Sequence, residues 1–132
     1  MFLLDTNVWL ELLLEQQKAD EVRQFLARHE GIELAITEFS LYSIGIILTR
    51  LKEDEAFADF LADTLEGSGV LLIRLDVTGL KELLTVRRKF GLDFDDAYQY
   101  VAAETHDLTL LSFDSDFDRT ERGRKTPAEV AG

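Results

Sequence analysis

Four short apolar runs, separated by segments in which apolar residues recur at three- and four-residue intervals, constrain the fold of this chain most strongly. The runs cover residues 2–4, 32–36, 70–75 and 108–112. Runs of this length are typical of buried strands, and the spacing between them is typical of helices that bury one face. Strands that alternate with helices indicate βαβ units. We therefore predict an α/β fold with a mostly parallel sheet.

Capping and helix-stopping residues divide the chain further. Thr6 or Asn7 follows the first strand and is predicted to cap a helix that runs to residue 14. Thr37 is predicted to cap a long helix that ends near Leu51. The sequence Gly67-Ser68-Gly69 should stop the next helix, and further helices are expected over residues 80–86 and 97–105. These signals describe one continuous domain, as expected for 132 residues.

Composition excludes several classes of protein. The chain has no cysteine, which rules out a disulfide scaffold and a thiolate metal site. Its formal net charge of −12 disfavours passive binding to membranes or to the nucleic-acid backbone. It does not exclude an enzyme that reaches phosphates through bound cations, because carboxylates hold such ions. Apolar runs fall short of the about 20 residues of a membrane span, and Asp5 and Glu11 interrupt the apolar N-terminus, so we expect a cytoplasmic protein.

Acidic residues follow two of the predicted strands. Asp5 ends the first strand, Asp114 lies just past the fourth, and a third acidic group opens the helix before that strand, namely Asp93, Asp95 and Asp96. Ligand sites of parallel sheets gather outside the carboxyl ends of the strands, so these acids can converge there. Unpaired carboxylates repel one another, which favours a cation between them. Ligands that are all oxygen favour Mg²⁺ or Mn²⁺.

Each acid taken singly also has a structural interpretation. Aspartate is a common N-cap at a turn from strand to helix, and the spacing of Asp93 and Asp96 resembles a capping arrangement. Solvation or capping is therefore the more ordinary role for Asp93, Asp95 and Asp96 considered one by one. The hypothesis of a site rests on several acids at crevice positions together.

Three short motifs resemble the PIN-domain family, the metal-dependent ribonuclease fold that includes toxins of type II toxin–antitoxin pairs. Leu4-Asp5-Thr6-Asn7 resembles the opening of these proteins, and Asp96-Ala97 followed by Ala102-Ala103 resembles their third motif. The stretch from Leu111 to Phe117, with Asp114 and Asp116, resembles their closing motif. The motifs are individually short, but their order and spacing cover the chain from residue 1 to about 117.

The resemblance implies a three-layer α/β/α domain over residues 1–118, with a mostly parallel sheet of four or five strands. It matches Asp5, Asp96 and Asp114 to the catalytic, metal-binding acids, with Asp116 as a further ligand. The implied reaction is hydrolysis of an RNA phosphodiester bond with Mg²⁺ or Mn²⁺. It also implies a homodimer and a cognate antitoxin protein as partners.

One motif departs from the family pattern. After the second strand the family carries an active-site Glu, and Ser43 stands at the matching position here. Glu38 lies five residues earlier, about 140° away around a helix, so it cannot simply take over that place. A serine adds no charge, although Ser43 and Ser112 are candidate accessory residues that can hydrogen-bond a carboxylate or water, and Asp93 is a candidate acid that compensates.

Alternative functions follow from that departure. The chain could be a catalytically weakened PIN module that acts as a binding or oligomerisation protein. A phospho-acceptor receiver domain fits less well, because it needs an acidic pair after the first strand, where a single Asp5 stands. Basic residues that could contact RNA are Arg87, Arg88 and Lys89, or the segment from Arg119 to Lys125. We expect residues 119–132 to form a loosely structured basic tail.

Overall fold

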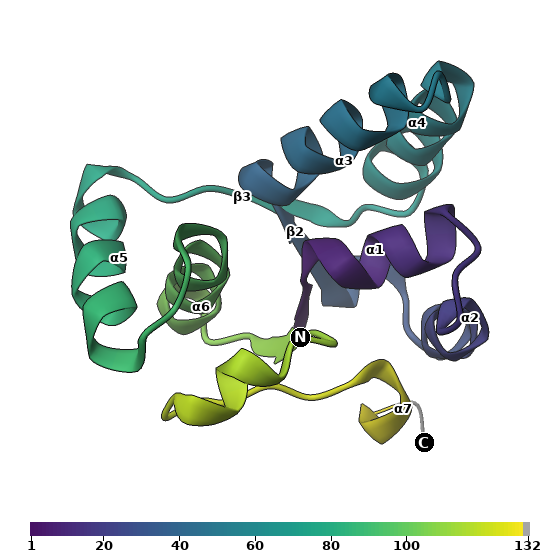
Figure 1. The fold of residues 1–132 in the computed structure, drawn as a ribbon. Coiled ribbons are helices and arrows are strands. Elements are labelled where there is room, and N and C mark those ends of the chain that lie inside the picture. Colours follow the sequence, from purple (N-terminus) through teal and green to yellow (C-terminus); the bar gives the residue numbers. More distant parts are fainter. Residues whose placement is uncertain (131–132) are drawn as a thin grey trace.

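The computed structural model describes residues 1–130, whose centre is a four-stranded parallel sheet (Figure 1). The strands are β1 (Phe2–Leu4), β2 (Leu34–Thr37), β3 (Leu71–Ile73) and β4 (Thr109–Leu111). Their order in the sheet is β3-β2-β1-β4, and every neighbouring pair is parallel. The predicted α/β fold with a parallel sheet is therefore confirmed. Each strand is shorter than the apolar run that indicated it, apart from β1.

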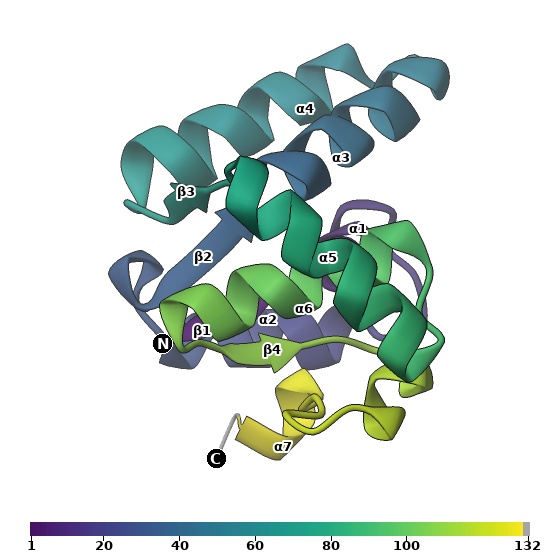
Figure 2. The ribbon, with the colours of Figure 1, turned by 90° about the vertical axis from the view of Figure 1, so that its left-hand side faces the viewer.

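Helices cover both faces of this sheet, as Figures 1 and 2 show together. One face carries α1 (Thr6–Leu13), α2 (Ala19–Arg28), α3 (Glu38–Arg50) and α4 (Asp54–Phe60), which continues as the π-helical segment η2 (Leu61–Gly67). The other face carries α5 (Val77–Phe90) and α6 (Phe94–His106). The short elements are η1 (Gly31–Glu33), η3 (Ser115–Arg119) and α7 (Pro127–Val130). The chain thus forms three layers.

Side-chain alternation along β1 builds the two cores. Leu3 is fully buried in the cluster that includes α5 and α6, whereas Leu4 is fully buried in the cluster that includes α1, α2 and α3. Successive side chains of a strand point to opposite faces, so a strand that is covered on both sides must be apolar at every position. This explains why a central strand appears in the sequence as a plain apolar run.

Two helix starts show how β-strands pass into helices at the carboxyl edge of the sheet. Thr37 caps α3 as predicted, because its Oγ1 accepts a hydrogen bond from the Ser40 backbone nitrogen at 3.0 Å. The cap of α1 is Asp5, not Thr6 or Asn7 as we predicted. The chain enters the helix one residue earlier, and the Asp5 carboxylate accepts a hydrogen bond from the Thr6 nitrogen at 2.8 Å.

The segment after residue 118 is more ordered than the loosely structured tail that we expected. Lys125 pairs with Leu111 beside β4, with backbone hydrogen bonds of 2.9 and 3.0 Å. The buried Pro127 begins α7, which packs against α2. The free backbone groups along the outer side of β4 explain this pairing, because an edge strand binds any extended segment that reaches it. Residues 131 and 132 of the expected tail lie outside the described residues.

Across residues 1–130, every helix is too short or too polar to cross a membrane.

Candidate metal centre

The acidic residues meet at the carboxyl ends of β1 and β4, which are neighbours in the sheet. Asp5 directly follows β1, and Asp114 lies three residues after the end of β4. Asp96 stands in the first turn of α6, which begins at Phe94 over the same edge. One parallel strand pair and one helix start thus bring Asp5 to the same edge as Asp96 and Asp114, which lie 91 and 109 positions later in the sequence.

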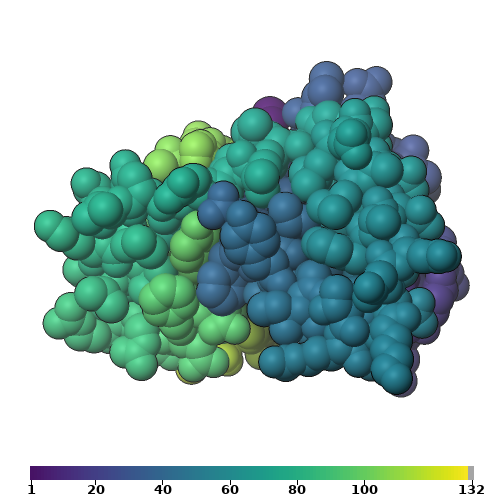
Figure 3. Space-filling model, turned by 90° about the horizontal axis from the view of Figure 1, so that it is seen from above, coloured from purple at the N-terminus to yellow at the C-terminus, as the bar shows by residue number. Residues whose placement is uncertain are grey.

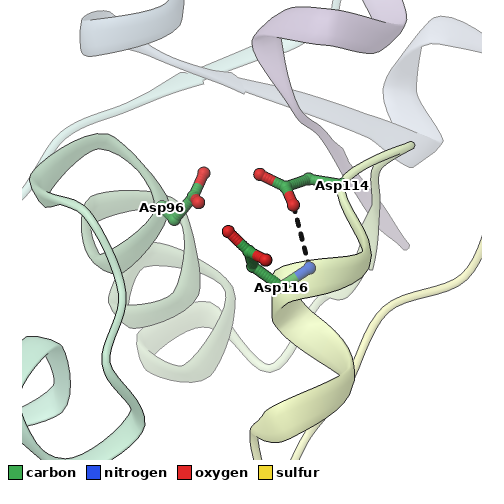
Figure 4. Close-up of side chains that lie close together, drawn as sticks. All are labelled: Asp96, Asp114 and Asp116. Atoms are coloured by element: carbon green, nitrogen blue, oxygen red, sulfur yellow. Dashed lines mark hydrogen bonds between the residues drawn. The ribbon is translucent and has the colours of Figure 1, made fainter.

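Three carboxylates form the open part of this centre, which we call the acidic cluster: Asp96, Asp114 and Asp116. One oxygen of each lies within 4.8 Å of the others. Figure 4 shows Asp96 reaching from α6 toward Asp114, the N-cap of η3, and Asp116 in the first turn of η3. The start of η3 is fixed locally, because the Asp116 nitrogen donates to Asp114 Oδ1 at 2.8 Å (Figure 4).

Asp5 lies outside the acidic cluster and is enclosed by the protein, with only 5% of its surface exposed. One carboxylate oxygen accepts hydrogen bonds from the Thr6 nitrogen at 2.8 Å and from Gln99 Nε2 at 3.0 Å. The other accepts from Ser112 Oγ at 2.7 Å and from Asn7 Nδ2 at 3.4 Å. The sequence groups Asp5 with the other acids. The structure instead buries Asp5 and gives its carboxylate four hydrogen-bond donors.

Ser112 connects Asp5 to the acidic cluster. Its hydroxyl is fully buried, donates to Asp5, and accepts a hydrogen bond from the Asp114 backbone nitrogen at 2.9 Å. The Asn7 amide joins the same group, since it donates to Ser112 Oγ at 3.2 Å and accepts from the Phe113 nitrogen at 3.2 Å. One serine therefore fixes the end of β4 relative to the end of β1.

The electrostatics of the centre reflect crowding of like charges. Burial, and then the neighbouring Asp114, raise the pKa of the Asp96 carboxyl from 3.8 to about 8, with smaller contributions from Asp5 and Asp95. Burial also raises the pKa of Asp5, although the hydrogen bonds from Gln99, Ser112 and Thr6 oppose that effect. Asp5 and Asp96 thus resist ionisation, as expected for partly or fully buried carboxylates that lie near one another.

The donor set fits a hard divalent cation. It consists of carboxylate oxygens from three side chains, and the part of the chain that the structure describes contains no cysteine that could favour a softer metal. Oxygen ligands suit Mg²⁺ and Mn²⁺, and a cation would relieve the repulsion that raises the Asp96 pKa. The residues present are therefore compatible with the metal that the sequence motifs implied.

The two remaining accessory candidates do not belong to the acidic cluster. Asp93 is the N-cap residue of α6 but makes no capping hydrogen bond with its side chain, and it is exposed. Ser43 is partly buried on α3, one turn after Ser40. Within residues 1–130, Asp93 is not one of the carboxylates that approach one another, and Ser43 has no carboxylate to add to them.

Sequence reasoning missed two buried residues that contact the centre, Gln99 and Ser40. The Gln99 amide lies between Asp5 and Ser40, and Ser40 Oγ shares a hydrogen bond of 2.7 Å with the Thr6 hydroxyl. Gln99 stands between Tyr98 and Tyr100 in a stretch otherwise composed of apolar and aromatic residues. A lone amide inside a buried helix segment was the available signal for a polar partner.

The structure thus defines a three-layer α/β/α domain with a parallel sheet. Acidic residues that could hold a metal ion gather at the carboxyl ends of two adjacent strands. The family model that matches this chain is the PIN domain, over residues 2–123. The chain therefore belongs to the PIN domain family. By sequence, no curated protein matches it significantly.

Solved structures with the same fold include proteins of toxin–antitoxin systems. A toxin–antitoxin complex from Klebsiella pneumoniae is 20% identical, with a TM-score of 0.75 and coverage of 96% of this chain and 98% of that chain. FitAcB from Neisseria gonorrhoeae is 20% identical, with a TM-score of 0.75 and coverage of 98% and 100%. Mycobacterium tuberculosis VapC20, a Sarcin-Ricin loop cleaving toxin, is 16% identical, with a TM-score of 0.78 and coverage of 96% and 100%. At these identities the likeness concerns the fold.

Proposed function

We propose that this PIN domain is a metal-dependent endoribonuclease that hydrolyses RNA phosphodiester bonds. The observation that carries the proposal is the acidic cluster of Asp96, Asp114 and Asp116 at the carboxyl edge of a PIN fold. The other acids of the chain do not form such a group within residues 1–130. Enzymes that cleave phosphodiesters commonly use cations held by carboxylates.

The residues take distinct roles in this proposal. Asp96, Asp114 and Asp116 would hold Mg²⁺ or Mn²⁺, and Asp5 would add the fourth carboxylate from the end of β1. When bound, such a cation polarises a phosphate and lowers the pKa of a water molecule. Ser112 keeps Asp5 and the Asp114 backbone in register through its two hydrogen bonds.

Basic residues beside the acidic cluster support RNA as the substrate. Arg119 lies 3.8 Å from Asp116 and donates to the Gly91 carbonyl at the end of α5, so the two basic stretches of the sequence meet here. Lys89 is paired with Glu121 across the same junction, whereas Arg87 and Arg88 are exposed. These cations offer local phosphate contacts on a chain whose net charge is −12.

The biological setting that we propose is the toxin of a toxin–antitoxin pair in the cytoplasm. The Klebsiella and Neisseria structures and VapC20 share the fold over nearly the whole chain. A cognate antitoxin would then be a protein partner that blocks the acidic edge.

Exposed apolar side chains support the homodimer that goes with this setting. They stand on α3 and α5, which both lie on the face seen in Figure 3, where α3 lies between α5 and α4. The residues are Tyr42, Ile46, Val77, Leu80 and Leu84. Apolar surface of this kind is typical of interfaces between subunits.

Cleavage of labelled single-stranded RNA by the purified metal-free chain tests the function directly. We expect cleavage only after Mn²⁺ or Mg²⁺ is added, its loss with EDTA, and at least a thousandfold loss in Asp114→Asn. Asp20→Asn, an exposed acid on α2, is the matched control and should retain activity. Cleavage that persists in EDTA, or in Asp114→Asn, would contradict the proposal.

Ser43 favours a second candidate function, a catalytically weakened PIN module that binds a partner. The neutral serine on α3 leaves the acidic cluster with fewer charges than the sequence motif leads one to expect. For a weakened enzyme we expect Ser43→Glu to raise the rate of RNA cleavage tenfold or more. An unchanged or lower rate would show that the serine is part of a working site.

A further inference from the structure

Gln99 is a fully buried amide that joins three elements at the acidic edge. It lies on α6 with 1% of its surface exposed. Its Nε2 donates to Oδ1 of Asp5, which follows β1, at 3.0 Å. The same nitrogen donates to Oγ of Ser40, in the first turn of α3, at 2.5 Å. Both hydrogens of the amide nitrogen are thus used, and each is directed at a different element.

The orientation of this amide follows from the chemistry of its neighbours. The nitrogen of Gln99 faces Asp5, because its two hydrogens are donated to the oxygens of Asp5 and Ser40. The consequence is that Gln99 Oε1 is buried without a hydrogen-bond partner. A buried carbonyl without a donor destabilises the folded state, so a side chain selected only for packing would not be an amide here.

We propose that Gln99 is a positioning residue that fixes the Asp5 carboxylate for cation binding at the acidic edge, an inference that rests on the proposed function. Gln99 and Ser112 contact different oxygens of Asp5, so they set the orientation of the carboxylate from both sides. Residues that hydrogen-bond to metal-site carboxylates commonly affect metal affinity by about 10- to 100-fold.

The link to Ser40 extends this role to α3. Ser40 Oγ is within 2.7 Å of the Thr6 hydroxyl, so Gln99, Ser40 and Thr6 form one buried chain of hydrogen bonds around Asp5. This chain holds the starts of α1 and α3 against α6. The neutral amide of Gln99 therefore links Asp5 to α3, the helix on which Ser43 stands where the family motif has a glutamate.

Titration calorimetry of Mn²⁺ into the metal-free chain tests the proposal with matched variants. Gln99→Met keeps the length of the side chain and removes both donated hydrogen bonds. Tyr98→Phe is the control, because it also removes one buried hydrogen bond from α6, that from the Leu75 nitrogen at 3.0 Å, without contacting Asp5. We expect about a tenfold or greater loss of Mn²⁺ affinity in Gln99→Met and less than a twofold change in Tyr98→Phe. Equal affinity of Gln99→Met and the wild type would overturn the proposal, as would equal losses in the two variants.

Separate results distinguish this inference from the proposed function. A wild type that binds no Mn²⁺ at millimolar concentration rejects the metal-dependent function. In that case urea unfolding in EDTA, measured for Gln99→Met, Asp5→Asn and the double variant, decides whether Gln99 positions Asp5. Non-additive unfolding midpoints support the positioning contact, and additive midpoints reject it. Gln99→Leu replaces Gln99→Met in both measurements if circular dichroism shows that the methionine variant is unfolded.

Discussion

Asp5 and Asp96 are the same residue type at the same edge of the sheet, yet the chain treats them in opposite ways. Asp5 is enclosed and receives four hydrogen bonds from its neighbours. Asp96 is partly exposed and faces Asp114 and Asp116, and burial, followed by the neighbouring Asp114, raises its pKa to about 8. Hydrogen-bond donors therefore define the position of Asp5, whereas burial and the neighbouring carboxylates define the protonation state of Asp96.

This contrast separates what the fold needs from what a ligand would complete. A buried charge whose donors are all present belongs to the folded structure, because removing it leaves those donors unpaired. A group of facing carboxylates without a cation weakens the fold and gains from binding one. The same edge of the sheet thus combines a hydrogen-bonded carboxylate, Asp5, with the acidic cluster, whose carboxylates face one another. The following experiments compare the two.

The largest effect should come from supplying the cation. We expect Mn²⁺ at 100 times its dissociation constant to stabilise the wild-type chain by about 2.7 kcal/mol, because it binds only the folded state. For a chain of this size that corresponds to a rise in Tm of roughly 10 °C. Differential scanning calorimetry with and without EDTA measures the shift. Asp114→Asn should show no rise, and a rise equal to that of the wild type would place the cation elsewhere.

Removing Asp5 should destabilise the metal-free chain. Asp5→Ala leaves four donors without their acceptor and removes the N-cap of α1, so we expect a loss of about 2 kcal/mol in the free energy of unfolding. Urea denaturation in EDTA measures this loss. Asp76→Ala, which removes the exposed cap of α5, is the control for capping alone and should cost about 1 kcal/mol. Equal losses in the two variants would mean that the enclosed donors add nothing.

Removing a charge from the acidic cluster should stabilise the metal-free chain, whereas removing Asp5 destabilises it. The folded pKa of Asp96 is about 8 against 3.8 for an ordinary carboxyl, so between these pH values the folded chain binds the proton more tightly than the unfolded chain does. The stability of the metal-free wild type should consequently fall as the pH rises from about 4 to about 8. Asp96→Asn should flatten this dependence and stabilise the chain by roughly 1 kcal/mol at pH 8, after allowance for its partial exposure. Denaturation midpoints at pH 5 and pH 8 are the measurement, and a destabilised Asp96→Asn would contradict the picture of repulsion.

The smallest effect should come from removing Arg119, whose guanidinium faces the acidic cluster. Arg119 lies 3.8 Å from Asp116, and both side chains are about half exposed. Arg119→Ala should increase Mn²⁺ affinity about twofold, because an exposed ion pair competes only weakly. Arg23→Ala, which removes a remote ion-paired arginine on α2, is the matched control and should leave the affinity unchanged. A weaker affinity in Arg119→Ala would show that the guanidinium supports the site.

The sequence predicts the architecture well because its signals are local. The apolar run at residues 2–4 must be a buried strand, and Thr37 caps α3 where the hydroxyl and the helix start coincide. The cap of α1 was placed one or two residues late, since Asp5, Thr6 and Asn7 are all good capping residues and only the backbone decides among them. The pairing of Lys125 with Leu111 has no periodic pattern, because it involves a single residue at a sheet edge.

The site divides in the same way. The sequence can place Asp5, Asp96 and Asp114 at one edge, because a parallel sheet fixes where strands end. It cannot tell which of them is enclosed, because the four donors around Asp5 come from residues up to 107 positions away. Gln99 was missed for the same reason, since its partners are the N-cap of α1 and a residue of α3 rather than residues of its own helix.

The pairing of β1 with β4 also governs when the acidic edge can exist during synthesis. Residues 2–4 are translated more than 100 residues before residues 109–111, so they gain their β4 partner only after the later segment has been made. Contacts between such distant segments form late in folding, because a long loop must be closed first. A nascent chain therefore lacks an assembled acidic edge until the segment that contains β4, Asp114 and Asp116 has been made.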